Sequence, residues 1–206
     1  MPGPEGVEWI DPSRMLYSLC TICDRLPGGV QRRFWQRPLA IHEDDWRQFE
    51  FVSAAFRAVV EAELEAIQVV RRGVHRDASG NPVGFRECHV RHEIESPLAH
   101  STVSMTEVQA AFRVKRKYRG LSIPPYLPLV RDGFAYETDS GLLVYGCASG
   151  GFVSELCLGP WSDSRPDAKV CDQIASLLQS RRLLLVHWPA GVVAADRAGV
   201  EQVFAG

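Results

Sequence analysis

The stretch from His42 to Arg72 constrains the fold more than any other part of the chain, because its apolar residues recur in steps of three and four. These residues are Trp46, Phe49, Val52, Phe56, Val59, Val60, Leu64, Ile67 and Val70. Such spacing places them on one face of an α-helix. Acidic residues at the start, and Arg71 and Arg72 before Gly73 at the end, suit the helix dipole and a helix stop. The sequence therefore predicts one long amphipathic helix over 42–72 that packs its apolar face on other elements.

Composition places the chain among ordinary folded proteins. It has 206 residues, of which 46% are hydrophobic and 23% are charged, so it can bury a core of domain size. No apolar run approaches the length of a membrane span, and the first residues lack the basic and apolar regions of a signal peptide. We expect no membrane association and a cytoplasmic location. Prolines and glycines within residues 1–40 predict an irregular N-terminal arm, and residues 41–206 are predicted to form a single α+β domain.

The rest of the domain is predicted from shorter patterns. Alternating apolar and polar residues indicate strands, and steps of three and four indicate helices. The predicted strands cover 85–94, 133–138, 142–148, 152–159, 183–188 and 191–195, and the predicted shorter helices cover 13–25, 104–114 and 163–179. Ser104 and Glu107 form the pattern of a capping box. This order predicts an α+β fold, in which a mostly antiparallel sheet carries the long amphipathic helix and two or three shorter helices on one face.

The cysteines bear on metal and thiol chemistry. Cys20 and Cys23 form one CxxC pair, which is half of a zinc site, and no second pair follows at a fitting distance. The sequence contains no motif of a serine hydrolase, of a zinc protease or of a phosphate-binding loop. We therefore predict reduced thiols, no cofactor, no bound metal and no catalytic residue. A small metal-dependent or thiol enzyme that uses Cys20, Cys23, His89 or the acidic helix start is the alternative.

A further alternative rests on the basic segment 113–119. It contains Arg113, Lys115, Arg116, Lys117, Arg119 and the aromatic Tyr118. Cations interleaved with an aromatic ring suit contacts with nucleic acid. Against this, the net charge of −2 provides no overall attraction to nucleic acid, and glutamates of the long helix can neutralise the segment within the fold. Nucleic-acid binding is therefore the less favoured alternative.

The helix start HEDDWRQFEFV, the strand FRECHVRH and the hairpin GLLVYGCASGGFVSEL lie within residues 41–95 and 133–160. Together they resemble small bacterial proteins of the immunity type, many of which are encoded beside secreted toxins of type VI and contact-dependent systems. The resemblance implies a non-enzymatic protein that binds one cognate protein toxin and blocks its active site.

The acidic start of the predicted helix offers a surface for such a partner. Complementary charge speeds association and selects partners, and large aromatic side chains anchor interfaces. The residues expected to bind the partner are Glu43, Asp44, Asp45, Trp46, Arg47, Glu50, His89 and Arg91. We expect this surface to engage a basic cleft, such as that of a nuclease toxin.

Overall fold

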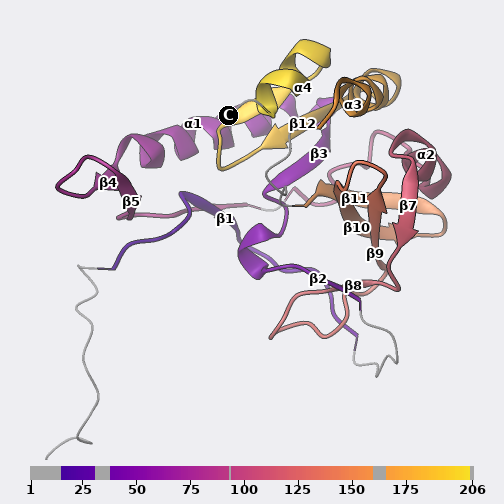
Figure 1. The fold of residues 1–206 in the computed structure, drawn as a ribbon, viewed down its shortest axis with the longest axis horizontal. Helices are drawn as coiled ribbons and strands as arrows, with labels where there is room; N and C mark the ends of the chain where they lie inside the picture. Colours follow the sequence, from indigo (N-terminus) through magenta and orange to yellow (C-terminus); the bar gives the residue numbers. More distant parts are fainter. Residues whose placement is uncertain (1–14, 31–37, 93, 160–165, 205–206) are drawn as a thin grey trace, which may run out of the picture.

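The computed structural model describes residues 15–30, 38–92, 94–159 and 166–204, and this part of the chain is built on a seven-stranded sheet (Figure 1). The strands lie in the order β13-β12-β3-β11-β10-β9-β7, and every neighbouring pair is antiparallel. Their bounds are β3 Phe49–Ser53, β7 Val114–Lys117, β9 Gly133–Thr138, β10 Leu143–Ser149, β11 Phe152–Leu158, β12 Leu183–His187 and β13 Val192–Ala194. The predicted α+β fold with a mostly antiparallel sheet is thereby confirmed.

Helices cover both faces of this sheet. They are α1 Arg57–Arg72, α2 Met105–Ala111, α3 Ala168–Arg181 and α4 Arg197–Val203. On β12, Leu185 packs in one cluster with residues of α2, α3 and α4. Its neighbour Leu184 points to the opposite face and packs in another cluster with Ile67 of α1. The prediction that all helices share one face was wrong, because strands with apolar residues on both sides must be covered twice.

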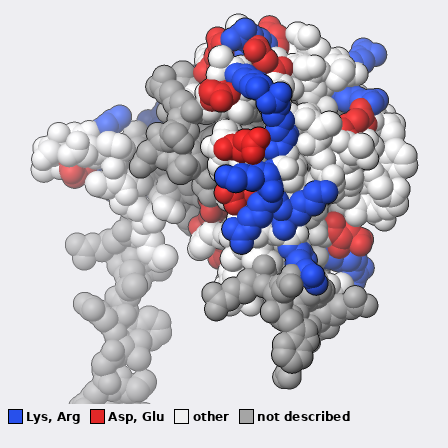
Figure 2. Space-filling model, turned by 45° about the vertical axis from the view of Figure 1, so that its right-hand side comes forward, with Lys and Arg blue, Asp and Glu red and all other residues white. Residues whose placement is uncertain are grey.

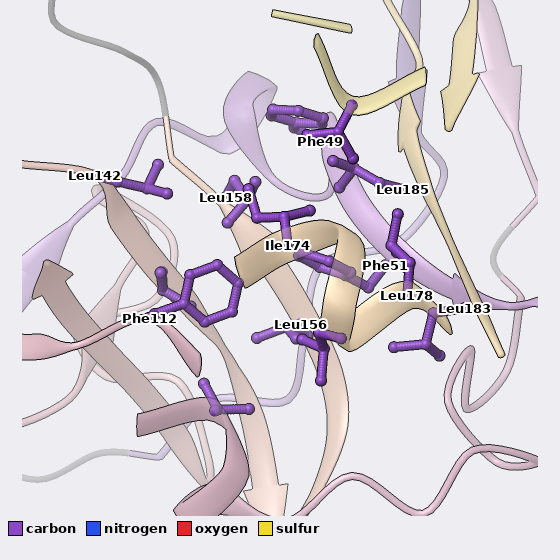
Figure 3. Packing of buried hydrophobic residues seen from close by; sticks show 14 of the residues in the cluster. Phe49, Phe51, Phe112, Leu142, Leu156, Leu158, Ile174, Leu178, Leu183 and Leu185 are labelled. Carbon is purple, nitrogen blue, oxygen red and sulfur yellow. The ribbon is translucent and has the colours of Figure 1, made fainter. Parts of the chain in front are cut away.

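The larger core lies between α3 and the middle of the sheet (Figure 3). Ile174 and Leu178 of α3 point toward the sheet. Their cluster includes Phe51 of β3 together with Leu156 and Leu158 of β11, and none of these five side chains is more than 2% exposed. Burial of apolar side chains is the main stabilising contribution to a fold, so β3 and β11 form the well-packed centre of the sheet.

The predicted helix over 42–72 is wrong in its first half. In the structure, the 3-10 helix η2 covers Glu43–Asp45, β3 covers Phe49–Ser53 and the 3-10 helix η3 covers Ala54–Phe56, before α1 begins at Arg57. The aromatic and β-branched residues of β3 suit a strand as well as a helix face, and pairing with β11 and β12 decides for the strand. The second half forms α1, which ends before a glycine and buries Val60, Leu64 and Ile67 of the predicted apolar face, whereas Val59 is exposed.

Shorter strand pairs attach part of the predicted arm to the domain. The pairs are β1 Thr21–Cys23 with β6 His89–Arg91 and β2 Leu39–Ala40 with β8 Leu121–Ser122, both parallel, and β4 Val74–Arg76 with β5 Pro82–Phe85, antiparallel. The helix predicted over 13–25 is wrong, since the described part of this range has no helix and contains β1. The strand predicted over 85–94 is divided between the end of β5 and β6. Residues 1–14 and 31–37 lie outside the described residues.

Several short patterns predicted the structure correctly. Ser104 Oγ accepts a hydrogen bond from the Glu107 N–H, and the Glu107 carboxylate accepts one from the Ser104 N–H, so the capping box of α2 is confirmed. The three strands predicted over 133–159 form the β9–β10–β11 meander. A Cβ on Gly146 would lie 1.9 Å from the Glu155 carbonyl oxygen, so the close approach of β11 requires glycine there. Among the described residues, no helix combines the length and the apolar character needed to cross a membrane.

Candidate functional site

The structure buries half of the residues predicted to bind a partner. Trp46 and Arg47 are each 1% exposed, and Glu50 and Arg91 are each 3% exposed. Side chains this deep in the protein cannot reach the surface of a partner. Their assignment as partner contacts is therefore corrected: they lie on β3, in the turn before it and at the end of β6, and their own side chains are buried.

The three buried charged residues belong to a polar network. Glu50 on β3 accepts hydrogen bonds from Arg47 Nε at 2.6 Å and from Trp188 Nε1 at 2.9 Å. Arg91 on β6 donates to Gln48 Oε1 at 2.9 Å and to the Arg47 carbonyl oxygen at 3.0 Å. The Arg91 guanidinium also lies 4.8 Å from the centroid of the Trp188 ring, a cation–π contact. The network joins β3, β6 and the residue after β12, so its role is to hold these elements together.

Burial and the nearby negative charge of Glu50 act in opposite directions on the pKa values of Arg47 and Arg91. Burial alone would lower the pKa of Arg47, but the adjacent Glu50 carboxylate outweighs burial and raises that pKa above its ordinary value. For Arg91, burial is the larger effect and lowers the pKa, and the charge of Glu50 opposes it. Glu50 is therefore the counter-ion on which both buried charges depend.

The other predicted contacts remain partly exposed. Glu43, Asp44 and Asp45 form the half-buried turn η2. His89 is also half-buried, and its Nε2 lies 2.6 Å from Glu63 Oε2 on α1. His89 is thus engaged by α1, and the acidic residues form a small turn instead of the extended acidic surface that a helix start would have provided.

The CxxC pair has the environment of structural thiols. Cys20 is buried, and its Sγ lies 3.5 Å from the Pro189 carbonyl oxygen. Burial raises the pKa of the Cys20 thiol and of the Cys23 thiol, which disfavours the thiolate that metal binding and nucleophilic attack both require. Within the described ranges, no group of three or more His, Cys, Asp or Glu side chains is placed to hold a metal ion. These observations do not favour the metal or thiol alternative.

One cavity brings a predicted residue next to a histidine. It has a volume of about 270 Å³, and its lining includes Asp45, Gln48, Phe49 and His187. Burial raises the pKa of Asp45 and lowers the pKa of His187, a divergence that is typical of acid–base pairs. His187 Nδ1, however, is shielded from solvent and has no hydrogen-bond partner in the described part of the chain. No hydrogen bond or ion pair joins Asp45 and His187 among the described residues, so we assign no acid–base role to the two side chains.

Exposed cations gather along β7, which forms one edge of the seven-stranded sheet. Figure 2, which brings this side of the molecule forward, shows Lys and Arg side chains gathered in a band. We define the basic face as the five exposed residues Arg113, Lys115, Arg116, Lys117 and Arg119. The sequence identified this basic segment, and the structure shows that it includes an edge strand over Val114–Lys117.

Most of the positive charge of the basic face is not neutralised locally. Arg116 Nη1 lies 3.9 Å from Glu137 Oε2 on β9, and Lys117 Nζ donates to the neutral Gln109 Oε1 at 2.8 Å. The other three cations of the face have no ion pair among the described residues. The glutamates of α1, which the sequence suggested as neutralising partners, lie under the opposite face of the sheet from α2.

A groove between α2 and α3 lies beside the basic face, and its charged lining comprises Arg113 and Lys169 together with Glu107 and Asp172. It has a volume of about 450 Å³, and Ala110, Ala111 and Leu177 supply its apolar lining. Arg113 and Lys169 line both this groove and a neighbouring hollow of about 180 Å³. Sequence reasoning missed Lys169, because only the packing of α3 beside α2 brings it close to the basic segment.

Comparison with known proteins found no matching family model, no matching curated protein and no matching solved structure. The resemblance to immunity-type proteins therefore stays a prediction. The function is argued below from the surface of this chain itself.

Proposed function

We propose that this chain is a non-enzymatic binding protein that recognises an acidic surface of a protein partner through its basic face, as an immunity protein would bind and block a cognate toxin. The observation that carries the proposal is the concentration of five exposed cations at one sheet edge, in a chain whose net charge is −2. A charge pattern this uneven needs a reason beyond solubility.

The basic face has the properties of a recognition surface. It lies on a strand of a well-packed sheet, so its cations are presented on a rigid support. Unpaired cations at the surface steer an oppositely charged partner into place and repel wrong partners. The groove beside the face has an apolar lining with two cations and two carboxylates, so it provides room for a protruding side chain of the partner but adds no net positive charge. In this proposal the chain contributes the positive charges and the partner the negative ones, whereas the sequence led us to expect an acidic surface on this chain and a basic cleft on the partner.

A protein partner is favoured over nucleic acid by the aromatic residues near the face. Proteins that bind single strands stack bases on exposed rings. Tyr118 is half-buried, and the Arg116 guanidinium already lies over its ring, 4.6 Å from the centroid. Tyr136 on β9 is 6% exposed, and Lys117 lies over it. Neither ring is open to a base.

The test uses charge reversal on two faces. The chain is co-expressed with the product of the neighbouring gene, and complex formation and suppression of toxicity are measured. The double variant Lys115→Glu/Lys117→Glu is expected to weaken the complex about tenfold, which corresponds to about 1.4 kcal/mol. The matched control Arg72→Glu/Arg76→Glu makes the same change in net charge on exposed residues at and beyond the end of α1, and it should leave the complex intact.

Two outcomes contradict the proposal. A toxin-suppressing complex that is equally tight with both double variants would place the contact elsewhere on the protein. Retention of nucleic acid by the wild-type chain, lost in Lys115→Glu/Lys117→Glu, would assign the basic face to nucleic acid.

A further inference from the structure

The strand that carries the basic face has an open backbone edge. β7 is the last strand of the seven-stranded sheet, and β9 is its one strand neighbour in the described part of the chain. Lys115, Arg116 and Lys117 are all exposed. An edge strand presents a row of N–H and C=O groups to which another extended chain can bind.

The direction of one peptide group can be worked out from its neighbour. The Tyr118 N–H donates to the Ala135 carbonyl oxygen on β9 at 2.9 Å, so the Tyr118 peptide group points into the sheet. Groups alternate in direction along an antiparallel strand. The N–H and C=O of Lys117 therefore point away from β9, toward the open edge.

Cations lie on both sides of this edge. Arg116 shares a side with Tyr118, which packs against a buried cluster that includes Ala135 and Tyr145, on the face of the sheet opposite α3. Lys117 lies over the Tyr136 ring, which belongs to the core on the α3 side. Side chains of an added strand would alternate between these two sides. A strand with acidic residues on both sides would meet a cation on each.

The same features disfavour pairing of this edge with a second copy of the chain. Lysine on an edge strand and an irregularity in the ladder both discourage pairing, and β7 has both, with a register shift between Val114 and Arg116. Two copies of β7 would bring like charges together, which is unfavourable. An acidic strand reverses the sign of that interaction, so the edge selects its partner by charge.

We propose that an extended acidic segment of the protein partner adds to β7 as an additional strand, with main-chain hydrogen bonds to Lys117 and with carboxylates of consecutive residues opposite Arg116 and Lys117. This inference rests on the proposed function, since it specifies how the basic face binds. Strand addition derives affinity from the backbone and specificity from alternate side chains.

The experiment uses defined probes with the full chain. The first probe is a short synthetic peptide in which pairs of consecutive glutamates alternate with pairs of valines, so that an added strand carries carboxylates on both sides. The second probe is the same peptide with alternate amide nitrogens methylated, which keeps the charge and removes backbone donors. The unmethylated peptide should bind and slow the hydrogen exchange of the Lys117 amide. The methylated peptide should bind about tenfold more weakly, because it cannot complete the ladder.

Two variants at one position separate charge from backbone. Lys117→Ala removes the charge and keeps the N–H, so peptide binding should weaken only a few-fold. Lys117→Pro also removes the N–H that points to the open edge, so peptide binding should be lost. An edge strand tolerates proline at such a position, because this N–H has no partner within the sheet. Circular dichroism checks that both variants fold. Should Lys117→Pro fail to fold, the methylated peptide still tests the proposal on the wild-type chain.

The outcomes distinguish the two proposals. Equal affinity for both peptides with an unprotected Lys117 amide, while Lys115→Glu/Lys117→Glu still weakens the toxin complex, overturns strand addition and leaves the proposed function standing. A toxin complex that is indifferent to Lys115→Glu/Lys117→Glu overturns the proposed function itself. A single-stranded oligonucleotide that displaces the peptide and protects the same amide overturns the assignment to an acidic protein segment.

Discussion

Replacement of Glu50 by glutamine tests whether the buried network is structural. The substitution keeps the size of the side chain but removes the negative charge beside Arg47, whose Nε lies 2.6 Å from Glu50 Oε2. Both side chains are almost fully buried, at 2% and 4% exposure. The result is a buried guanidinium without its counter-ion.

The expected cost of Glu50→Gln is large. Removal of one partner of a buried ion pair typically destabilises a protein by about 3–5 kcal/mol. Glutamine retains one oxygen that can accept from Trp188 Nε1, which Glu50 bonds at 2.9 Å, so we expect a loss at the lower end, about 3 kcal/mol. For comparison, the whole stability of a domain is about 5–15 kcal/mol.

The assay is urea unfolding followed by tryptophan fluorescence, which reports on the buried Trp46 and Trp188. The control is Glu61→Gln on α1, which removes the same charge from a surface pair with Arg57 at 3.6 Å, where the side chains are about half exposed. That pair should contribute no more than about 0.5 kcal/mol. The double variant Arg47→Met/Glu50→Gln should lose less stability than the two single variants added together, because it also removes the Arg47 guanidinium that Glu50→Gln alone leaves without its adjacent counter-ion.

A Glu50→Gln loss as small as that of Glu61→Gln would refute this reasoning. The same result would follow if Glu50 lay at the surface, as the sequence-based assignment to a partner-binding site required. The measurement therefore also tests the correction made to that site.

Two other predictions concern stability. Arg182 ends α3 at a φ of 52°, a region that favours glycine, and its side chain is exposed, so Arg182→Gly should raise the free energy of unfolding by about 0.5–1 kcal/mol; a lower urea midpoint would contradict this. Burial, followed by the charge of Arg71, lowers the pKa of His187 below its ordinary value of 6.5, so below that pH the unfolded chain binds a proton that the folded chain resists. The free energy of unfolding should therefore fall as the pH decreases from 7 to 5, and that of His187→Phe should fall less steeply. Urea unfolding that gives the same pH dependence for both proteins would count against this.

Local patterns in the sequence predicted the structure correctly where the stabilising interactions join residues close together in the chain. The capping box of Ser104 and Glu107 lies within one helical turn. The β9–β10–β11 meander joins neighbours along the chain through short turns, and its alternating residues predict both strands and turns. The second half of the predicted helix forms α1, because steps of three and four continue through it and its end suits the dipole.

Tertiary structure decided the segment from Phe49 to Ser53. Its spacing fits a helix face, yet it pairs with β12, more than a hundred residues later, and with β11 on its other side. Neither partner can be read from residues near the segment. Once this segment is a central strand, its Glu50 points into the protein, and a residue predicted to bind a partner becomes a buried counter-ion.

For the basic face, too, some properties follow from the sequence and others from the tertiary structure. Its five cations are a property of the sequence, since they are consecutive or nearly so between residues 113 and 119. Their position on an open sheet edge depends on the strand order, and the proximity of Lys169 depends on the packing of α3 beside α2. Sequence by itself determined which residues carry the charge, because charge belongs to the side chain. Only the tertiary structure decided which charges are exposed together, because exposure depends on contacts between elements far apart in the chain.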